Sequence, residues 1–327
     1  MITVGFTYDL RDDYIMQGFS EEDAAEFDSK ETIDSIEEAL QANGYVVERI
    51  GNVKALVGAL ATGKRWDIVF NICEGVKGIG REAQVPSLLE AYDMPFVFSS
   101  PEMLIITTDK ALAKGVLRDC GIATPAWQVI EDDKNLSVKG LEFPLFMKPV
   151  AEGSSKGISE HSVVKDEDAF KKSASYFLNK YNQPVLVETY LTGREFTVGI
   201  LGLGDASRVI AVMEVSLEGQ PDSFGRSFLN KDVDWTMPEI YCLPDDPVAQ
   251  KAGVLALAAW RGLKGRDVGR VDVRCDEQGN PWILEINALP GLNRKKSDLP
   301  ILAAKSGIDH TTLIGKIMGE AKKRYGL

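Results

Sequence analysis

Carboxylate, amide and arginine side chains alternate with apolar residues near the C-terminal end of the sequence. The two segments are Gly-Arg-Val-Asp-Val-Arg-Cys (269–275) and Pro-Trp-Ile-Leu-Glu-Ile-Asn (281–287). Strand residues two apart share a face, so Arg270 accompanies Asp272, and Glu285 accompanies Asn287. If the segments pair through the Asp-Glu-Gln-Gly-Asn turn between them, three oxygen ligands converge beside an arginine. Hard oxygen ligands of this kind suit Mg²⁺ bound together with phosphate.

The same alternation has a simpler interpretation, in which the polar side chains form the solvated outer face of a hairpin. Antiparallel sheets commonly bury one face and expose the other. Only further phosphate-binding features elsewhere in the chain would favour the magnesium site over the solvated face.

A lysine-bearing strand leads into a loop rich in glycine and serine. The predicted strand 143–150 carries Lys148 between apolar residues, where a lysine needs an anionic partner or an outward orientation. The following Glu-Gly-Ser-Ser-Lys-Gly segment (152–157) could wrap phosphate oxygens with its backbone N–H groups, or be an ordinary turn. Lys110 lies in the first turn of a predicted helix (109–120), where the helix dipole disfavours a cation and a functional reason is therefore favoured.

Two further segments carry residues that could contact a nucleotide. Glu188 and Glu195 frame a polar hinge between the predicted strands 184–191 and 194–200, where a carboxylate can accept ribose hydroxyls. Two surface glutamates are the alternative. The irregular stretch 216–238 contains Lys231, and unstructured loops of this length are often lids or binding loops.

Composition excludes several classes of function. The chain has 327 residues, enough for two or three lobes, and its net charge of −12 argues against general nucleic-acid binding. It lacks an apolar run of the ~20 residues that a membrane helix needs, and its first residues show no basic leader. Four scattered cysteines are typical of a reduced, cytoplasmic protein, and two histidines make a His-based zinc site or a Ser-His-Asp triad unlikely to form.

The first third of the sequence alternates strands with helices. The expected strands are 2–8, 45–50, 66–71 and 95–98, and the expected helices are one that Asp28 caps and Gly44 ends, and one at 85–92. This order predicts a parallel α/β lobe whose ligands lie beyond the carboxyl ends of the strands. Asn71, Glu74, Arg81 and Glu82 would lie near that edge.

An acidic segment, 9–27, interrupts this lobe after its first strand. A run of charges is usually a solvated loop or surface helix. The alternative is a lid or a site for a cationic substrate.

Five phrases resemble, in matching order, the ATP-grasp superfamily and within it the D-alanine–D-alanine ligases. They are Phe146-Met147-Lys148-Pro149, Glu152-Gly153-Ser154-Ser155-Lys156-Gly157, Val187-Glu188 through Glu195-Phe196-Thr197-Val198, Gly269-Arg270-Val271-Asp272, and Leu284-Glu285-Ile286-Asn287-Ala288-Leu289-Pro290-Gly291. The resemblance implies a mixed α/β and α+β fold with an N-terminal Rossmann-like lobe (1–105), a central ATP-binding lobe (106–190) and a C-terminal catalytic lobe (191–327). It also implies an ADP-forming ligase of peptidoglycan biosynthesis that joins amino acids through an acyl-phosphate, with a homodimer as the implied assembly.

The resemblance assigns roles to individual residues. For ATP, Lys110 and Lys148 would contact the α- and β-phosphates, the loop with Glu152, Ser154 and Ser155 would close over the phosphates, Glu188 and Leu191 would hold adenine, and Glu195 the ribose. Asp272, Glu285 and Asn287 would hold two Mg²⁺ ions, with Mn²⁺ as a substitute. The catalytic residues would be Arg270 at the tetrahedral intermediate, the Gly291 N–H as an oxyanion donor, Ser154, and Lys231 at the γ-phosphate.

The sequence departs from the family mainly where amino acids would bind. The family's glycine-rich turn and its glutamate for the first substrate's amine are replaced by residues 6–12 and the acidic segment, with Asp28 as a candidate substitute. Glu74-Gly75 stands where the family tends to have His-Gly, and the loop 293–298 is more basic than usual. A ligase for another amino acid or amine and a non-catalytic ATP-binding regulator are therefore alternatives. Simple nucleotide binding does not need Arg270, which argues against the regulator.

Overall fold

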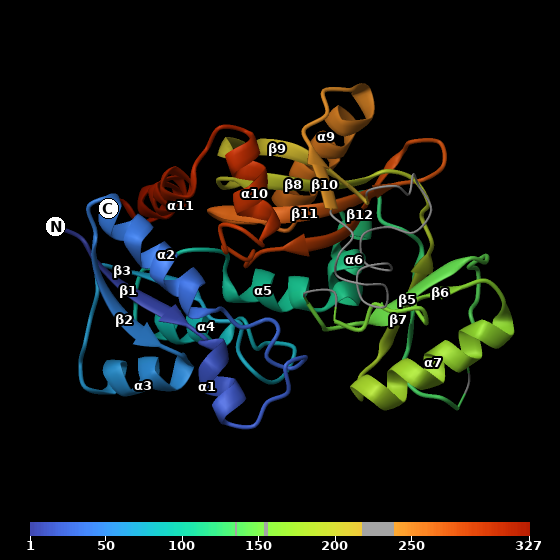
Figure 1. Ribbon diagram of the computed structural model, residues 1–327, viewed down its shortest axis with the longest axis horizontal. Helices are drawn as coiled ribbons and strands as arrows, with labels where there is room; N and C mark the ends of the chain where they lie inside the picture. Colours follow the sequence, from blue (N-terminus) through green and yellow to red (C-terminus); the bar gives the residue numbers. More distant parts are fainter. Residues whose placement is uncertain (135, 154–155, 218–238) are drawn as a thin grey trace.

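The computed structural model describes residues 1–134, 136–153, 156–217 and 239–327, which build three sheets in chain order. Figure 1 shows the parallel sheet at one end, the four-stranded sheet at the other, and the five-stranded sheet above them. No helix among these residues is both long and apolar enough to cross a membrane.

The first sheet has the strand order β2-β1-β3 and is parallel throughout, as the alternation of strands and helices predicts. Its strands are β1 (Thr3–Tyr8), β2 (Val46–Gly51) and β3 (Ile68–Ile72), and its helices are α1 (Arg11–Met16), α2 (Lys30–Ala42), α3 (Val53–Ala61), α4 (Gln84–Ala91) and α5 (Pro101–Thr108). The fourth strand expected at 95–98 is wrong, because Phe96 forms only an isolated bridge to Val69. Asp28 does not cap α2 either; the Ser29 hydroxyl accepts the hydrogen bond from the Thr32 N–H.

The second sheet is antiparallel, with the order β4-β7-β5-β6. It comprises β4 (Trp127–Ile130), β5 (Leu145–Pro149), β6 (Val163–Val164) and β7 (Val185–Thr189), with α6 (Lys110–Asp119) leading in and α7 (Glu167–Tyr181) packed on it. Asp109 caps α6 through the N–H groups of Ala111 and Leu112, which fixes Lys110 at the first helical position.

The third sheet is also antiparallel and has the order β10-β9-β8-β11-β12. Its elements are β8 (Glu195–Leu201), the short 3-10 helix η1 (Gly204–Ala206), β9 (Arg208–Leu217), β10 (Glu239–Cys242), α9 (Pro247–Gly262), β11 (Val268–Cys275) and β12 (Pro281–Asn287). Trp260 of α9 lies against Gly269, where a Cβ would stand 2.1 Å from the indole ring. Only glycine allows the packed helix to approach β11 this closely.

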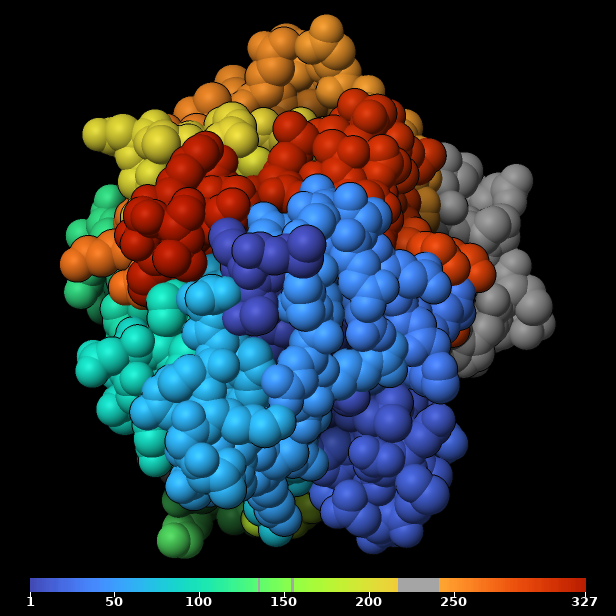
Figure 2. All heavy atoms as spheres, turned by 90° about the vertical axis from the view of Figure 1, so that its left-hand side faces the viewer, coloured from blue at the N-terminus to red at the C-terminus, as the bar shows by residue number. Residues whose placement is uncertain are grey.

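The last two helices, α10 (Asp298–Lys305) and α11 (His310–Tyr325), return the chain to the first lobe. Apolar residues of α2 and α11 belong to one continuous core, and the Asn43 amide donates to the Thr311 carbonyl at 2.9 Å. Figure 2 shows the C-terminal residues, in red, directly above the N-terminal residues, in blue. The first lobe is therefore completed by the end of the chain.

Candidate active site

A cavity of about 620 Å³ lies where the three sheets meet, and it gathers the predicted site residues that the structure describes. Those that line it are Lys110, Lys148, Glu152, Glu188, Leu191, Glu195, Arg270, Asp272, Glu285, Asn287 and Gly291. Ser154, Ser155 and Lys231 lie outside the described residues, so their predicted roles stay predictions.

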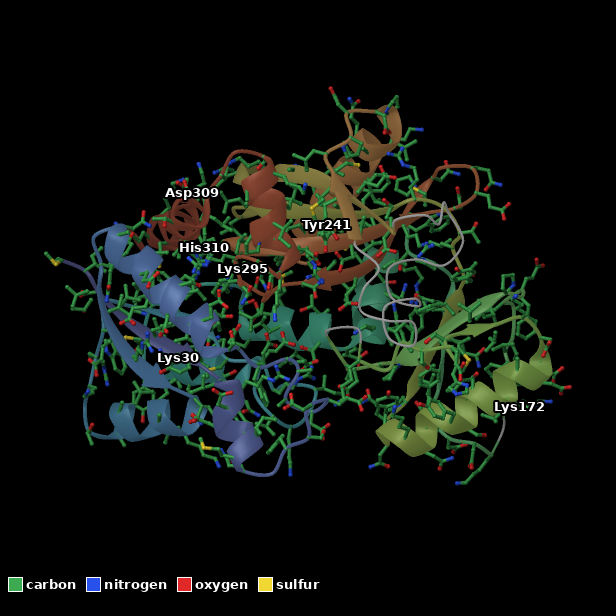
Figure 3. The ribbon with its side chains drawn as sticks, in the orientation of Figure 1. Lys30, Lys172, Tyr241, Lys295, Asp309 and His310 are labelled. Atoms are coloured by element: carbon green, nitrogen blue, oxygen red, sulfur yellow. The ribbon has the colours of Figure 1, made fainter. Side chains whose placement is uncertain are left out.

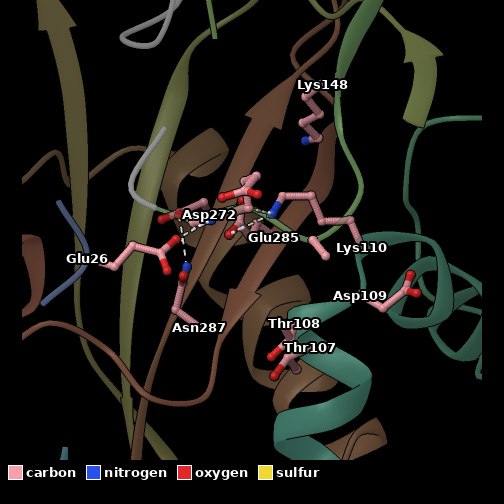
Figure 4. Close-up of polar contacts among 12 residues, drawn as sticks. Glu26, Thr107, Thr108, Asp109, Lys110, Lys148, Asp272, Glu285 and Asn287 are labelled. Carbon is pink, nitrogen blue, oxygen red and sulfur yellow. Dashed lines mark hydrogen bonds and ion pairs between the residues drawn. The ribbon is translucent and has the colours of Figure 1, made fainter. Parts of the chain in front are cut away.

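The hairpin of β11 and β12 forms one wall of the cavity. Its register places Asp272 opposite Glu285 and Arg270 opposite Asn287, so the polar side chains share a face. The Arg270 guanidinium donates to both Asp272 oxygens at 3.1 and 2.9 Å, and the Asn287 amide donates to Asp272 at 3.1 Å. Figure 4 shows this cluster and its connection to Lys110. The solvated-face interpretation is therefore wrong, because these groups face the cavity.

Neighbouring charges shift the pKa values of the two hairpin carboxyls, Glu285 and Asp272, in opposite directions. Burial by itself raises the pKa of the Glu285 carboxyl, but Lys110, Lys148 and Arg270 outweigh it and hold the pKa below its usual value. For Asp272 the balance is reversed, since burial together with Glu285 and Asp298 keeps its pKa raised despite Arg270. Two mutually repelling carboxylates beside an arginine are a favourable place for an additional cation.

Lys110 and Lys148 approach the cavity from the opposite side, and each is held by a carboxylate. The Lys110 ammonium lies 3.6 Å from Glu285 and donates to the Glu152 carbonyl. The Lys148 ammonium lies 2.8 Å from Glu188. Both lysines are less than a tenth exposed, so neither is a solvated surface lysine.

Glu188 has a partner that the sequence analysis missed. Lys114 lies 2.7 Å from the second Glu188 oxygen and donates to the Thr124 hydroxyl at 2.7 Å. Although burial opposes ionisation, Lys114 and Lys148 lower the pKa of Glu188 to about 2. Lys114 lies four residues after Lys110 on one helix, and this spacing was the available signal for a second lysine facing the site.

Two more of the predicted carboxylates, Glu195 and Glu152, line the cavity, and each forms an ion pair. Glu195 lies 3.1 Å from the Arg274 guanidinium, which is packed over the Tyr190 ring. Glu152 accepts from the Gln183 amide at 2.6 Å and lies 3.2 Å from Lys156. Strand alternation places Arg274 on the face of Arg270 and Asp272, so its position was also readable from the sequence.

The segment after β12 joins the hairpin wall to the first lobe. Gly291 passes so close to Ser297 that a Cβ would lie 2.7 Å from its hydroxyl oxygen. The Asn293 amide donates to the Thr32 hydroxyl at 2.8 Å, and Lys295 lies 2.8 Å from Glu31. Figure 3 shows Lys295 beside α2. Asp298, which begins α10, lies 3.3 Å from Arg270 and is a second contact of that arginine that the sequence analysis missed.

The acidic segment after β1 reaches into the cavity instead of remaining solvated throughout. Glu26 accepts from the Gly153 N–H at 2.7 Å and lies 3.2 Å from Arg81, which also donates to the Ala151 carbonyl at 2.9 Å. In Figure 4 the Glu26 carboxylate points towards Asp272 and Asn287.

Asp28, Glu74 and Glu82 line the same end of the cavity as Glu26. Burial and the nearby Asp9 raise the pKa of Asp28 to about 7. Burial also raises the pKa of Glu82 to about 7, against the opposing effect of Arg81. The pKa of Glu74 is raised well above its usual value by burial and by the other three carboxylates.

The oxygen donors on the hairpin fit the chemistry of Mg²⁺. Among the residues that the structure describes, no group of three His, Cys, Asp or Glu side chains is arranged to hold a metal ion. The hairpin instead offers two carboxylates and an amide oxygen, which are the hard oxygen donors that Mg²⁺ accepts when phosphate and water complete its shell. The repulsion that raises the pKa of Asp272 is consistent with a cation binding there.

Comparisons with known proteins identify relatives over most of the chain. Residues 116–319 match the family model described as the D-ala D-ala ligase C-terminus. A D-alanine–D-alanine ligase of Marinomonas sp. is 30% identical over 302 residues, covering 89% of this chain and 90% of that protein.

Solved structures share the whole fold. The D-alanine–D-alanine ligase of Bacillus anthracis complexed with ATP superposes with a TM-score of 0.75 at 21% identity, covering 100% of this chain and 99% of that one. The VanG D-Ala:D-Ser ligase of Enterococcus faecalis gives a TM-score of 0.73 at 18% identity, covering 98% and 99%. Both confirm the ATP-grasp fold expected from the sequence, with a parallel first lobe and two antiparallel sheets around the cavity.

Proposed function

The chain belongs to the D-alanine–D-alanine ligase family, and we propose that it is an ATP-dependent, ADP-forming ligase that joins two amino acids. One observation carries the proposal. Two buried lysines, Lys110 and Lys148, face the Arg270–Asp272–Glu285–Asn287 hairpin across a single cavity. Phosphoryl transfer needs charge neutralisation and positioning, and lysines that face this hairpin across the cavity supply both.

The reaction would proceed in two balanced steps. A carboxylate oxygen of one amino acid attacks the γ-phosphorus, which forms an acyl-phosphate and releases ADP. The amine of the second amino acid then attacks the acyl carbon, loses a proton and displaces inorganic phosphate, leaving a peptide bond. In the second step negative charge grows on the former carbonyl oxygen, and we propose that Arg270 and the Gly291 N–H stabilise it.

On binding ATP, Lys110 and Lys148 would exchange a carboxylate partner for a phosphate oxygen. Lys110 is held by Glu285, and Lys148 by Glu188, at ion-pair distance. A phosphate oxygen entering the cavity finds these ammonium groups already oriented, so little ordering remains to be done on binding.

Mg²⁺ would be held by Asp272, Glu285 and Asn287. When bound, it would neutralise charge on the transferring phosphoryl group. Arg270 would then keep Asp272 ionised and oriented, since burial and neighbouring carboxylates otherwise favour its protonated form.

At the adenine and ribose end, the structure favours a revised role for Glu188. Its side chain is 2% exposed and is held by Lys114 and Lys148, so we propose that it orients these lysines instead of contacting adenine directly. Leu191 keeps the proposed adenine contact. Glu195, fixed by Arg274, keeps the proposed contact with ribose hydroxyls.

The test is ADP release by the purified protein with ATP, Mg²⁺ and a panel of D- and L-amino acids. We expect release that depends on amino acid and yields equal amounts of phosphate and of a dipeptide detected by mass. Tight ATP binding without any amino-acid-dependent ADP would instead identify the non-catalytic regulator.

A further inference from the structure

The end of the cavity in the first lobe contains more carboxyl groups than the described residues pair with cations. Glu26, Asp28, Glu74 and Glu82 line it. Arg81 is the cation beside them, and its ion pair is with Glu26. Among the described residues, Asp28, Glu74 and Glu82 form no ion pair, and the partly exposed portion of each faces the cavity.

The remaining cations of the cavity form their ion pairs with other carboxylates. Lys110 lowers the pKa of Glu82 but forms its ion pair with Glu285, and Arg270 forms its ion pairs with Asp272 and Asp298. Lys296 also lines the cavity, but its charge acts on Glu31 at the outer end of α2. Burial of uncompensated carboxylates is costly, so a wall of this kind is stabilised by a cation that the ligand brings.

The geometry favours an organic cation over a metal ion. These carboxylates are not arranged as a metal-binding group, as the described residues contain no such cluster of three. They are instead distributed along a cavity wall between β3 and α4 on one side and the segment before α2 on the other. An extended ligand with separated positive charges matches such a distribution better than one small ion.

A neutral amino acid supplies a single ammonium group, which would leave carboxylates unpaired. We propose that this end of the cavity binds the cationic side chain of a basic amino acid, so that one substrate of the ligation carries an ammonium or guanidinium group besides its α-amino group. This inference rests on the proposed ligase function. The carboxylates named above would be the specificity-determining residues, because only a substrate with an additional positive charge satisfies them.

The unfavourable protonation states support the same inference. Burial and mutual repulsion raise the pKa of Glu74 well above its usual value, and the Thr108 hydroxyl only partly offsets the effect of burial on Glu82. A bound cation removes this repulsion and restores ionisation.

The inference is tested by ligand binding, which does not depend on turnover. Calorimetry would measure the affinities for lysine and arginine against those for their neutral counterparts, norleucine and citrulline, in both chiralities and with a non-hydrolysable ATP analogue present. We expect at least one basic amino acid to bind about tenfold more tightly than its neutral counterpart, as desolvated charge pairs do. Glu74→Gln and Asp28→Asn should each remove most of this preference.

Matched controls separate a local effect from overall charge. Asp12 and Asp13 are exposed, belong to the acidic segment 9–27 and do not line the cavity, so Asp12→Asn and Asp13→Asn should keep the preference. Because Glu74→Gln and Asp28→Asn remove mutually repelling charges, both variants should stay folded, which a thermal melt verifies.

Each outcome has a distinct meaning. Equal binding of norleucine and lysine would overturn the inference, while dipeptide formation from neutral amino acids would still uphold the ligase. Binding of Ca²⁺ or Mg²⁺ that Glu74→Gln abolishes, without lysine binding, would overturn it in favour of a metal site. Selective lysine binding without any ADP release would uphold the cationic subsite and reject the ligase function.

Discussion

The two ends of the cavity differ in whether their charged side chains are ion-paired. At the end between the two antiparallel sheets, every lysine and arginine discussed above lies at ion-pair distance from a carboxylate, as Lys148 does with Glu188. At the end in the first lobe, Glu74 and Asp28 lack such a partner among the described residues. The paired end is ordered before any ligand arrives, whereas the unpaired end stays electrostatically unfavourable until a cation enters.

The contrast coincides with where the sequence resembles the family and where it departs from it. The paired end contains the motifs shared with the ligases, in which cation and carboxylate are preorganised for phosphoryl transfer. The unpaired end contains the acidic segment and Glu74, where the sequence departs from the family. Substitutions at the two ends should therefore affect different kinetic constants.

The largest effect is expected from Glu285→Gln at the paired end. The change removes a proposed Mg²⁺ ligand and the partner of Lys110, while its isosteric amide preserves packing. We expect kcat to fall by at least about 10³-fold, the upper range for groups that stabilise transition-state charge. The measurement is ADP formation at saturating Mg²⁺. Glu277→Gln, in the exposed turn of the same hairpin, is the control and should retain activity.

Arg270→Ala should reduce kcat by about 10²–10³-fold and spare ATP affinity, since the proposed charge appears only in the transition state. Arg270→Lys keeps a charge between Asp272 and Asp298, so it separates folding from chemistry. Arg266→Ala, outside the cavity, is the control. Loss of ATP affinity with unchanged kcat would make Arg270 a phosphate ligand.

Lys148→Ala should raise the KM for ATP by at least about tenfold, or about 1.4 kcal/mol. Glu188 keeps Lys114 as a partner, so the variant should remain folded. Lys172 is exposed on α7 and labelled in Figure 3, and Lys172→Ala should leave the KM unchanged. An unaltered KM in Lys148→Ala would contradict the proposed phosphate contact.

The smallest effect concerns pH and the unpaired end. The folded pKa of Asp28 is raised to about 7, so the folded state holds its proton more tightly than the unfolded chain. This contribution is fully present below the unfolded pKa of about 3.9 and is lost as pH rises through about 7. As pH rises from 6 to 8, the loss of this contribution should lower the free energy of unfolding of the ligand-free protein by about 1 kcal/mol.

Thermal melts of the ligand-free protein and of Asp28→Asn at pH 6, 7 and 8 check this prediction. The titratable groups coupled to Asp28 are Asp9, Cys73 and Glu74, and all three are present in both proteins, so the difference between the two proteins isolates the contribution of Asp28. His310 has the opposite effect. Burial lowers its pKa, so the folded state prefers the neutral imidazole and this contribution to stability increases as pH rises. Identical pH profiles for the two proteins would show that Asp28 is ordinarily ionised.

The sequence predicted those features that follow from local periodicity. Alternation in a strand placed Asp272 with Arg270, and the position of Lys148 in an apolar strand indicated an anionic partner. These depend on residues two apart, so no tertiary information was needed. The parallel first lobe was predictable for a similar reason, since its strands and helices alternate.

Other features depended on contacts between distant segments. The spacing of Lys114 from Lys110 indicates which face of α6 it occupies, but its pairing with Glu188 joins distant segments. The pairing of Asp298 with Arg270 likewise follows from no local pattern. Ser29 caps α2 in place of Asp28, and adjacent residues that both favour an N-cap cannot be told apart by local preference alone. Phe96 lies next to β3 but makes only one bridge, so the alternation of strands and helices predicted a strand that pairing does not extend.

The return of α11 to the first lobe has a consequence for synthesis on the ribosome. The face of α2 that carries Ile33 and Ile36 shares its core with Leu313 and Ile317 of α11. During translation this apolar face emerges some 270 residues before its covering helix, so it stays exposed to chaperones until α11 has been synthesised. The N-terminal lobe, although made first, is therefore the last to complete its core.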